Sequence, residues 1–295
     1  MVKKLPMGWL RDYPDFRDYT PEHDKIQPLL EKVGVAPTPK LAKKDLPSSV
    51  DLRAWFPPIE DQGNIGSCTA NAGVALVEYF EKRACGKHID ASRLFLYKVT
   101  RKLLNFEGDT GAFLRTTIGA MALFGVPPEQ YWAYTDDPQK YDEEPPAFCY
   151  AFAQNYQALH YFRLDPPGYP KDKLVIRIKD LLSCNIPSMF GFSVYSSMWD
   201  AVDGKIPFPS THEKLEGGHA IVAVGYDDKM TITNPNPGGP TTKGAFLIRN
   251  SWGESWGDRG YGWLPYEYVA QGLADDWWSL LKAEWVDTEP FLSET

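Results

Sequence analysis

The sequence predicts an α+β fold, in which a mostly helical half is followed by a half made mainly of strands. From residue 68 to about residue 161, apolar residues recur at helical spacing. From about residue 159 onward, short apolar runs alternate with turn-rich segments. With 295 residues the chain is long enough for two lobes around a substantial core. Helices followed by strands are the pattern of the α+β class.

Residues 1–46 are predicted to form a leader that precedes the main body. A short helix-compatible piece spans residues 25–33, and a Pro- and Lys-rich stretch over residues 36–44 is typical of an exposed linker. Residues 11–19 show no sustained period. The leader is therefore expected to be largely irregular in structure.

The main body is expected to begin with helices over residues 68–84, 92–104 and 112–124. Ser92 is a plausible N-cap for the second of them, and Gly125 stops the third. A further helix is expected over residues 173–184. Strands are predicted where turns bound apolar runs, over residues 186–195, 219–226, 245–250 and 261–264.

Composition excludes several classes of function. A net charge of −8 and a pI near 5.2 predict neither a nucleic-acid partner nor an acidic-membrane partner. The first residues do not resemble a signal peptide, and no segment is long enough to span a bilayer. The irregular spacing of the cysteines predicts neither a disulfide framework nor a zinc site; they are Cys68, Cys85, Cys149 and Cys184. A reduced, cytoplasmic setting is the simplest expectation, and an exported protein without disulfides also fits.

The stretch from Gln62 to Cys68 is the strongest indication of function. Cys68 opens an apolar, helix-like run, which places its thiol at the positive end of a helix dipole. That position favours the thiolate and therefore a nucleophile. A lone cysteine is more often a small core hydrophobe, but here a glutamine precedes it and two suitable partners follow.

Those partners are a histidine and an asparagine. His219 follows two glycines and begins a buried-strand run, so it is expected to be rigid yet approachable, although a histidine there is often only a core residue. It would take the thiol proton and return it to the leaving amine. Asn250 ends another apolar run and would orient the ring, with Trp252 covering that hydrogen bond. Gln62 and the backbone N–H of Cys68 would form an oxyanion hole.

Three blocks in this order resemble the signatures of papain-family cysteine peptidases: residues 62–68, 218–226 and 250–262. Residues 46–53 also resemble the start of the mature family domain, so the resemblance covers about residues 46–285. It implies a two-lobed domain over residues 47–285, followed by a tail over residues 286–295. Its helical lobe would span about 60–160, and its β lobe about 161–285 together with 47–59. The active site would lie in the cleft between the lobes.

The resemblance also implies roles for single residues. Cys68 would be the nucleophile, His219 the base and acid, Asn250 the orienting residue and Gln62 the oxyanion donor. Trp256 would line the leaving-group side. The further residues expected to bind substrate are Gly111, Gly218 and Trp252, with Gly111 pairing through its backbone; Gly111 fits a helix-opening loop equally well.

The chain departs from the family pattern at three positions. Thr69 stands where an aromatic residue usually follows the nucleophile, Ile65 replaces a cysteine, and Gly218 replaces an Asp or Asn. The short leader resembles that of xylellain-like bacterial enzymes. We hypothesise that residues 1–46 lie across or beside the cleft, through Trp9, Tyr13 and Phe16, and keep the enzyme latent.

The resulting interpretation is a cysteine endopeptidase acting on a peptide or protein substrate through a thiolate–imidazolium pair and a thioester. No cofactor and no metal are expected, because no third or fourth ligand accompanies Cys68 and His219. Two alternatives remain on the same scaffold: a noncatalytic peptide-binding module, and a thiol acyltransferase that passes the acyl group to an amine. The sequence does not indicate the natural substrate or the oligomeric state.

Overall fold

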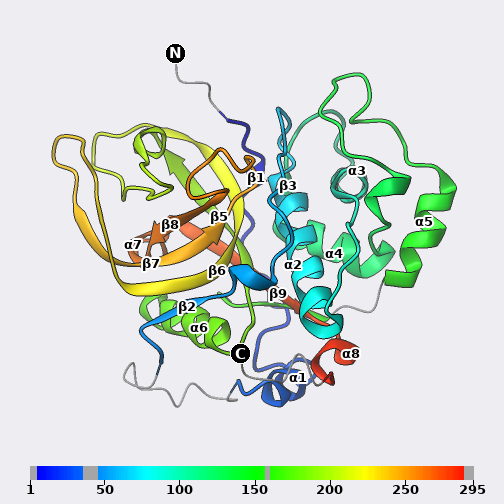
Figure 1. The fold of residues 1–295 in the computed structure, drawn as a ribbon, viewed down its shortest axis with the longest axis horizontal. Helices are drawn as coiled ribbons and strands as arrows, with labels where there is room; N and C mark the ends of the chain where they lie inside the picture. Colours follow the sequence, from blue (N-terminus) through cyan, green and yellow to red (C-terminus); the bar gives the residue numbers. More distant parts are fainter. Residues whose placement is uncertain (1–4, 36–45, 157–159, 289–295) are drawn as a thin grey trace.

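Helix α2 (Cys68–Cys85) lies where the two halves of the molecule meet, with the other main helices of the helical half on one side and a large sheet on the other (Figure 1). The computed structural model describes residues 5–35, 46–156 and 160–288. α2 is buried almost all round and packs against both α3 and β6. This burial follows from its sequence, because small and apolar residues cover nearly every face. Gly86, in the left-handed conformation at φ +72°, ends the helix.

The helical half confirms the predicted helices and adds to them. α3 (Arg93–Leu103) starts where Ser92 Oγ accepts a hydrogen bond from the backbone N–H of Phe95 at 3.1 Å. The helix predicted over residues 112–124 is α4 (Leu114–Phe124), but its first two residues form strand β3 (Ala112–Phe113) instead. They pair with the leader, a contact that local periodicity cannot reveal. Helix α5 (Ala147–Ala153) was not predicted from the sequence.

The other half is a seven-stranded antiparallel sheet in the order β4-β9-β5-β6-β7-β8, with β2 paired to β6. Its strands are β2 (Ser49–Asp51), β4 (His160–Arg163), β5 (Ser188–Tyr195), β6 (Leu215–Thr233), β7 (Thr241–Arg249), β8 (Tyr261–Pro265) and β9 (Ala274–Leu281). All four predicted strands are present, and the one expected over residues 219–226 is the middle of the much longer β6. The helices packed on this half are α6 (Lys171–Ser183) and α7 (Tyr266–Ala270).

Strand β9 was not predicted from the sequence, although it lies inside the sheet between β4 and β5. All eight of its residues are buried, so it lacks the alternation of polar and apolar residues that marks a half-exposed strand. Trp277 stacks on Phe190 with ring centroids 3.8 Å apart. Two of the late tryptophans, Trp277 and Trp278, therefore lie in the core of the sheet lobe.

The leader runs between the two halves. Strand β1 (Trp9–Leu10) pairs in parallel with β3 and lies between β3 and β6 in Figure 1. Helix α1 (Gln27–Lys32) is slightly shorter than predicted and packs against α8 (Ala283–Val286). The whole of the predicted linker (residues 36–44) and most of the predicted tail lie outside the described residues.

Short 3-10 helices complete the described elements. They are η1 (Arg53–Trp55), η2 (Glu129–Tyr131), η3 (Gln154–Tyr156) and η4 (Ser196–Asp200). Among the residues that the structure describes, no helix combines the length and the apolar character needed to cross a membrane.

Candidate active site

Three distant segments bring Cys68, His219 and Asn250 together. Cys68 is the first residue of α2, His219 lies in β6, and Asn250 follows β7. The backbone N–H of Ala220, next in the chain to His219, donates to Cys68 Sγ at 3.4 Å. On its other side, His219 Nε2 lies 2.8 Å from Asn250 Oδ1. The thiol therefore lies against the backbone of the strand segment that carries His219, and the amide of Asn250 is hydrogen-bonded to the imidazole.

The hydrogen bond to Asn250 determines the tautomer of His219. A carbonyl oxygen can only accept a hydrogen bond, so Nε2 carries the proton in this pair. Nδ1 is then left with its lone pair, and it finds no hydrogen-bond partner among the described residues. In this arrangement Nδ1 is the nitrogen available to take a proton.

Burial keeps both groups neutral in this state. Cys68 and His219 are each 0% exposed. Burial raises the pKa of the Cys68 thiol to about 11, against the opposing effect of nearby backbone N–H groups, including those of Ala220 and Gly8. Burial lowers the pKa of His219 to about 4, although its hydrogen bond to Asn250 acts in the other direction. Both shifts favour the neutral thiol and the neutral imidazole over a thiolate–imidazolium pair.

Gln62 is held by hydrogen bonds to Ser251, which follows β7 of the sheet, and to Ile65, which precedes α2. Its Oε1 accepts a hydrogen bond from Ser251 Oγ at 2.6 Å, and its backbone N–H donates to the Ser251 carbonyl at 2.8 Å. Its Nε2 donates to the carbonyl of Ile65 at 3.0 Å. The same Nε2 lies 3.3 Å from the carbonyl of Pro6 in the leader. Gln62 thus donates its side-chain amide to one carbonyl of the body and to one carbonyl of the leader.

Aromatic rings cover the histidine. Trp252 stacks on His219, with ring centroids 4.3 Å apart and planes 21° apart. Trp256 meets Trp252 edge-on at 5.8 Å. Two further rings were not expected from the sequence: Phe192 approaches the edge of His219 at 6.0 Å, and Trp199 stacks on Trp252 at 6.1 Å. Neither belongs to a motif, so only the folded chain reveals them.

The leader occupies the space over the thiol. The carbonyl of Pro6 also accepts from Trp252 Nε1, at 3.2 Å. The carbonyl of Gly8 accepts from the backbone N–H of Ala112 at 2.8 Å. A Cβ atom on Gly8 would lie only 1.8 Å from the carbonyl oxygen of Gly66, so the leader backbone here is in closest contact with the body.

The two glycines expected to bind substrate both contact the leader. A Cβ on Gly111, which has φ +72°, would lie 2.2 Å from the carbonyl oxygen of Gly8. A Cβ on Gly218 would lie 2.7 Å from that of Trp9. The leader thus lies against the two glycines that were predicted to bind substrate.

Of the three leader aromatics singled out from the sequence, only Trp9 enters the site. It is 7% exposed, whereas Tyr13 and Phe16 are 74% and 91% exposed. The expectation for Tyr13 and Phe16 is therefore wrong. Tyr13 and Phe16 are exposed because the pairing of the leader with β3 ends at Leu10, and the chain then passes to the surface.

The cysteines are all free thiols, and Ile65, at the position where the family usually has a cysteine, is buried at 3% exposure. Ile65 therefore packs in the core and cannot form a disulfide at this position. Within residues 5–35, 46–156 and 160–288, no cluster of three or more His, Cys, Asp or Glu side chains is arranged to hold a metal ion.

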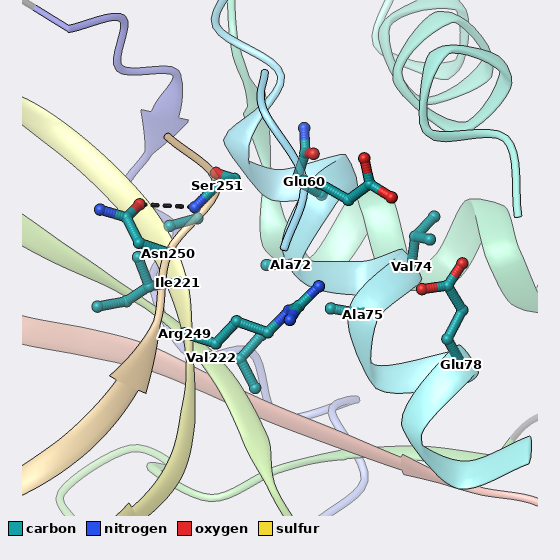
Figure 2. A pocket seen from close by; sticks show the side chains of 12 residues that line it. Glu60, Ala72, Val74, Ala75, Glu78, Ile221, Val222, Arg249, Asn250 and Ser251 are labelled. Carbon is teal, nitrogen blue, oxygen red and sulfur yellow. Dashed lines mark hydrogen bonds between the residues drawn. The ribbon is translucent and has the colours of Figure 1, made fainter. Parts of the chain in front are cut away.

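A small cavity of about 10 Å³ lies behind Asn250, between the sheet and α2. Figure 2 shows Asn250 and Ser251 on one side, Glu60 and Glu78 on the other, and Arg249 between them. Ser251 donates its backbone N–H to Asn250 Oδ1 at 2.8 Å, the dashed line in the figure. The volume matches that of about one water molecule.

Comparison with known proteins agrees with this geometry. The family described as Papain family cysteine protease matches residues 46–276. The solved structure of xylellain, a cysteine protease from Xylella fastidiosa, is 34% identical, with a TM-score of 0.73 over 96% of this chain and 98% of its own. A peptidase C1-like protein of Acanthamoeba polyphaga mimivirus is 32% identical over 97% of this chain and 88% of its own length. Cathepsin K of Mus musculus is 24% identical over 74% of this chain and 60% of its own length. The chain belongs to the papain family and is a cysteine peptidase with a two-lobed fold.

Proposed function

We propose that this chain is an endopeptidase that cleaves peptide bonds through a thioester on Cys68 and that its own leader holds it latent. The observation that carries the proposal is the hydrogen bond between His219 and Asn250 on the strand segment that contacts the Cys68 thiol, together with a Gln62 side-chain N–H that is donated to a leader carbonyl. These groups meet the requirements of nucleophile, base, orienting residue and oxyanion donor.

In the proposed mechanism, His219 Nδ1 takes the proton of Cys68 and the sulfur attacks the carbonyl carbon of the substrate. The oxyanion is stabilised by Gln62 Nε2 and the backbone N–H of Cys68. His219 then protonates the leaving amine, and a thioester remains on the sulfur. A water molecule that gives its proton to His219 hydrolyses the thioester and restores the thiol. Asn250 keeps Nε2 protonated throughout.

The leader atoms that face the thiol support the proposed latency. The backbone N–H of Gly8 lies close enough to Cys68 Sγ to lower the pKa of the thiol, in opposition to burial. An N–H group cannot be attacked by sulfur, whereas a scissile peptide would present its carbonyl carbon there. The leader therefore fills the site without being a substrate in this pose. It also excludes the water that an ion pair needs.

Catalysis by Cys68 is tested by comparing Cys68→Ala with Cys85→Ala, which removes an exposed free thiol elsewhere on the same helix. We expect Cys68→Ala to abolish cleavage of a dipeptidyl fluorogenic amide and labelling by an epoxide thiol reagent, and Cys85→Ala to retain both. Turnover by Cys68→Ala at the parent rate would refute the mechanism. Product mass spectrometry with an added amine separates hydrolysis from acyl transfer.

Latency is tested by comparing Trp9→Ala with Phe16→Ala in the full chain. Trp9 is buried against the body and Phe16 is exposed, so both substitutions remove a leader aromatic but only the first removes a contact. We expect Trp9→Ala to turn over substrate faster than the parent, and Phe16→Ala to match the parent. Equal rates for all three chains would contradict autoinhibition by the leader.

A further inference from the structure

The hydroxyl of Tyr134 joins the two ends of the loop that leads to the nucleophile. This loop, residues 62–67, begins at Gln62 and ends at Ser67, directly before Cys68. Tyr134 Oη lies 2.8 Å from the backbone carbonyl oxygen of Gln62 and 2.6 Å from Ser67 Oγ. One atom from outside the loop therefore contacts both of its ends. Tyr134 follows η2 and lies in none of the three blocks that resemble the papain family.

The direction of each hydrogen bond follows from the groups at its two ends. Asn71 Nδ2, in the first turn of α2, donates to Ser67 Oγ at 3.0 Å, because an amide nitrogen cannot accept. The carbonyl of Gln62 can only accept, so Tyr134 donates its hydroxyl proton to it. Ser67 must then donate to Tyr134 Oη. The result is a continuous chain of donors that runs from Asn71 through Ser67 and Tyr134 to the carbonyl of Gln62.

A buried arginine holds the ring of Tyr134. The guanidinium of Arg93 lies 4.1 Å from the ring centroid, and Arg93 is 6% exposed. Arg93 is itself fixed by ion pairs with Glu129 at 2.9 Å and Glu60 at 2.8 Å. Its Nη1 also lies 3.4 Å from Asn71 Oδ1, which fixes the orientation of that amide. The hydroxyl is therefore placed by contacts outside the loop that it joins.

Burial makes these hydrogen bonds necessary. Gln62 and Ser67 are each 0% exposed, and Asn71 is 5% exposed. A carbonyl or hydroxyl that lost its partner here would find no solvent to replace it, which is unfavourable. Burial also raises the pKa of Tyr134 above its ordinary value of 10, so the hydroxyl keeps its proton and remains a donor.

The two ends of the loop lead to the two groups assigned to the oxyanion. Gln62 would supply its side-chain Nε2, and Ser67 is followed by Cys68, which would supply its backbone N–H. The separation and direction of these donors determine how well they stabilise negative charge on the substrate oxygen. Because Tyr134 fixes Gln62 relative to Ser67, it also fixes one oxyanion donor relative to the other.

We propose that Tyr134 is a positioning residue for the oxyanion hole, acting through its hydroxyl on Gln62 and Ser67. The inference rests on the proposed peptidase function, in which the two donors stabilise the tetrahedral oxyanion. In this role Tyr134 acts through its neighbours and not on the substrate. It keeps the donors at the separation that the transition state requires, so its contribution appears in kcat and not in KM.

The test is Tyr134→Phe in the full chain carrying Trp9→Ala, because phenylalanine keeps the ring on Arg93 and removes only the hydroxyl. With a dipeptidyl fluorogenic amide we expect kcat to fall by about ten- to a hundredfold and KM to change by less than about threefold. The matched control is Tyr79→Phe, which removes a buried hydroxyl of α2 that donates to the carbonyl of Asn185 at 3.0 Å. The control should keep the kcat of the Trp9→Ala chain.

A second reaction separates the alignment of the oxyanion donors from general disorder of the site. When iodoacetamide alkylates a thiol, sulfur bonds to carbon, iodide leaves and the thiol proton passes to a base, and no oxyanion forms. The rate at Cys68 is measured by peptide mass spectrometry relative to the exposed Cys85 of the same sample. We expect Tyr134→Phe to leave this rate within about twofold of that of the Trp9→Ala chain, because formation of the thiolate is unchanged.

Ser67→Ala interrupts the same chain of donors at its next member. In the Trp9→Ala chain it should also lower kcat while the alkylation rate stays the same. Combined with Tyr134→Phe, it should cause a loss smaller than the product of the two separate losses, because both variants break one connection. Losses that multiply would show that the two hydroxyls act independently and would overturn the inference.

The outcomes distinguish this inference from the proposed function. A Tyr134→Phe chain with the kcat of the Trp9→Ala chain would overturn the role of Tyr134 and leave the peptidase function standing. An equal fall in kcat and in alkylation of Cys68 would also overturn it, since the whole site would then be disturbed. Absence of cleavage by the Trp9→Ala chain would refute the latent-peptidase proposal, and this inference with it. If Tyr134→Phe fails to fold, Ser67→Ala in the same two assays decides the question.

Discussion

At the scale of single residues, Asn250 joins two neighbouring parts of the site. Its Oδ1 accepts from His219 Nε2 at 2.8 Å and from the backbone N–H of Ser251 at 2.8 Å. Ser251 in turn donates its hydroxyl to Gln62. The ring of the proposed base and the proposed oxyanion donor are therefore positioned by consecutive residues after β7.

We predict that Asn250→Ala lowers kcat/KM by about ten- to a hundredfold, measured in the Trp9→Ala chain, because the His219 ring is no longer held in its productive orientation. Asn250→Asp should recover part of the loss, since a carboxylate oxygen accepts the same two hydrogen bonds. Its negative charge would also raise the pKa of His219 and move the alkaline limb of the pH profile upward. Full activity of Asn250→Ala would refute an orienting role.

At the scale of elements, α2 carries an acid in its buried face. Glu78 is 2% exposed, and its Oε1 accepts the backbone N–H of Ala91 at 2.9 Å. Burial raises its pKa from the ordinary value of 4.5 to about 8, against the opposing effect of that hydrogen bond. Between these two values the folded chain retains a proton that the unfolded chain has lost. Glu78 therefore makes stability fall as the pH rises from about 4.5 to about 8.

We predict that Glu78→Gln reduces this pH dependence, because glutamine keeps an acceptor for Ala91 and has no proton to lose. The free energy of unfolding is measured with urea at pH 5 and at pH 8. The change between these two pH values should be smaller in Glu78→Gln than in the parent. The expected reduction is roughly 1.4 kcal/mol for each unit by which the pKa of Glu78 differs between the folded and unfolded chain. Glu143→Gln, at an exposed position, is the control and should retain the parent difference. If Glu78→Gln showed the same change in the free energy of unfolding between pH 5 and pH 8 as the parent, Glu78 would not be protonated in the folded chain.

The elements also show what the sequence can and cannot predict. α2, α3 and the four expected strands follow from local patterns of apolar residues, and the site residues lie in short blocks of fixed spacing. Strand β3 was mistaken for the first turn of a helix because its partner is the leader, about a hundred residues away. The place of Tyr134 was also out of reach, since it lies in none of the recognised blocks and contacts Gln62, 72 residues away in the chain.

At the scale of the whole molecule, ion pairs fasten the leader to the body along its length. Arg115 in α4 makes a bidentate pair with Asp18, at 2.8 and 2.7 Å, and also contacts Asp12. Arg177 in α6 pairs with Glu22 further along the leader. These contacts add to the strand pairing and to the burial of Trp9.

We predict that Arg115→Ala raises the turnover of the full chain by about five- to thirtyfold, because loss of a partly buried ion pair weakens leader docking by about 1–2 kcal/mol. The matched control is Arg53→Ala. Arg53 makes a similar bidentate pair with Asp51 within the body, so its loss should leave latency unchanged. An Arg115→Ala chain that is no more active than the parent would show that these pairs do not contribute to latency.

The leader of this protein is joined covalently to the site that it covers. Docking of Pro6, Gly8 and Trp9 is therefore a unimolecular equilibrium, and the docked fraction is the same in a dilute sample as in a crowded one. Under the proposed latency, dilution, which dissociates an inhibitor carried on a separate chain, would not activate this enzyme. Activation would instead require a change in the molecule itself, such as cutting of the chain between leader and body, or a competing ligand that outbinds the tethered segment.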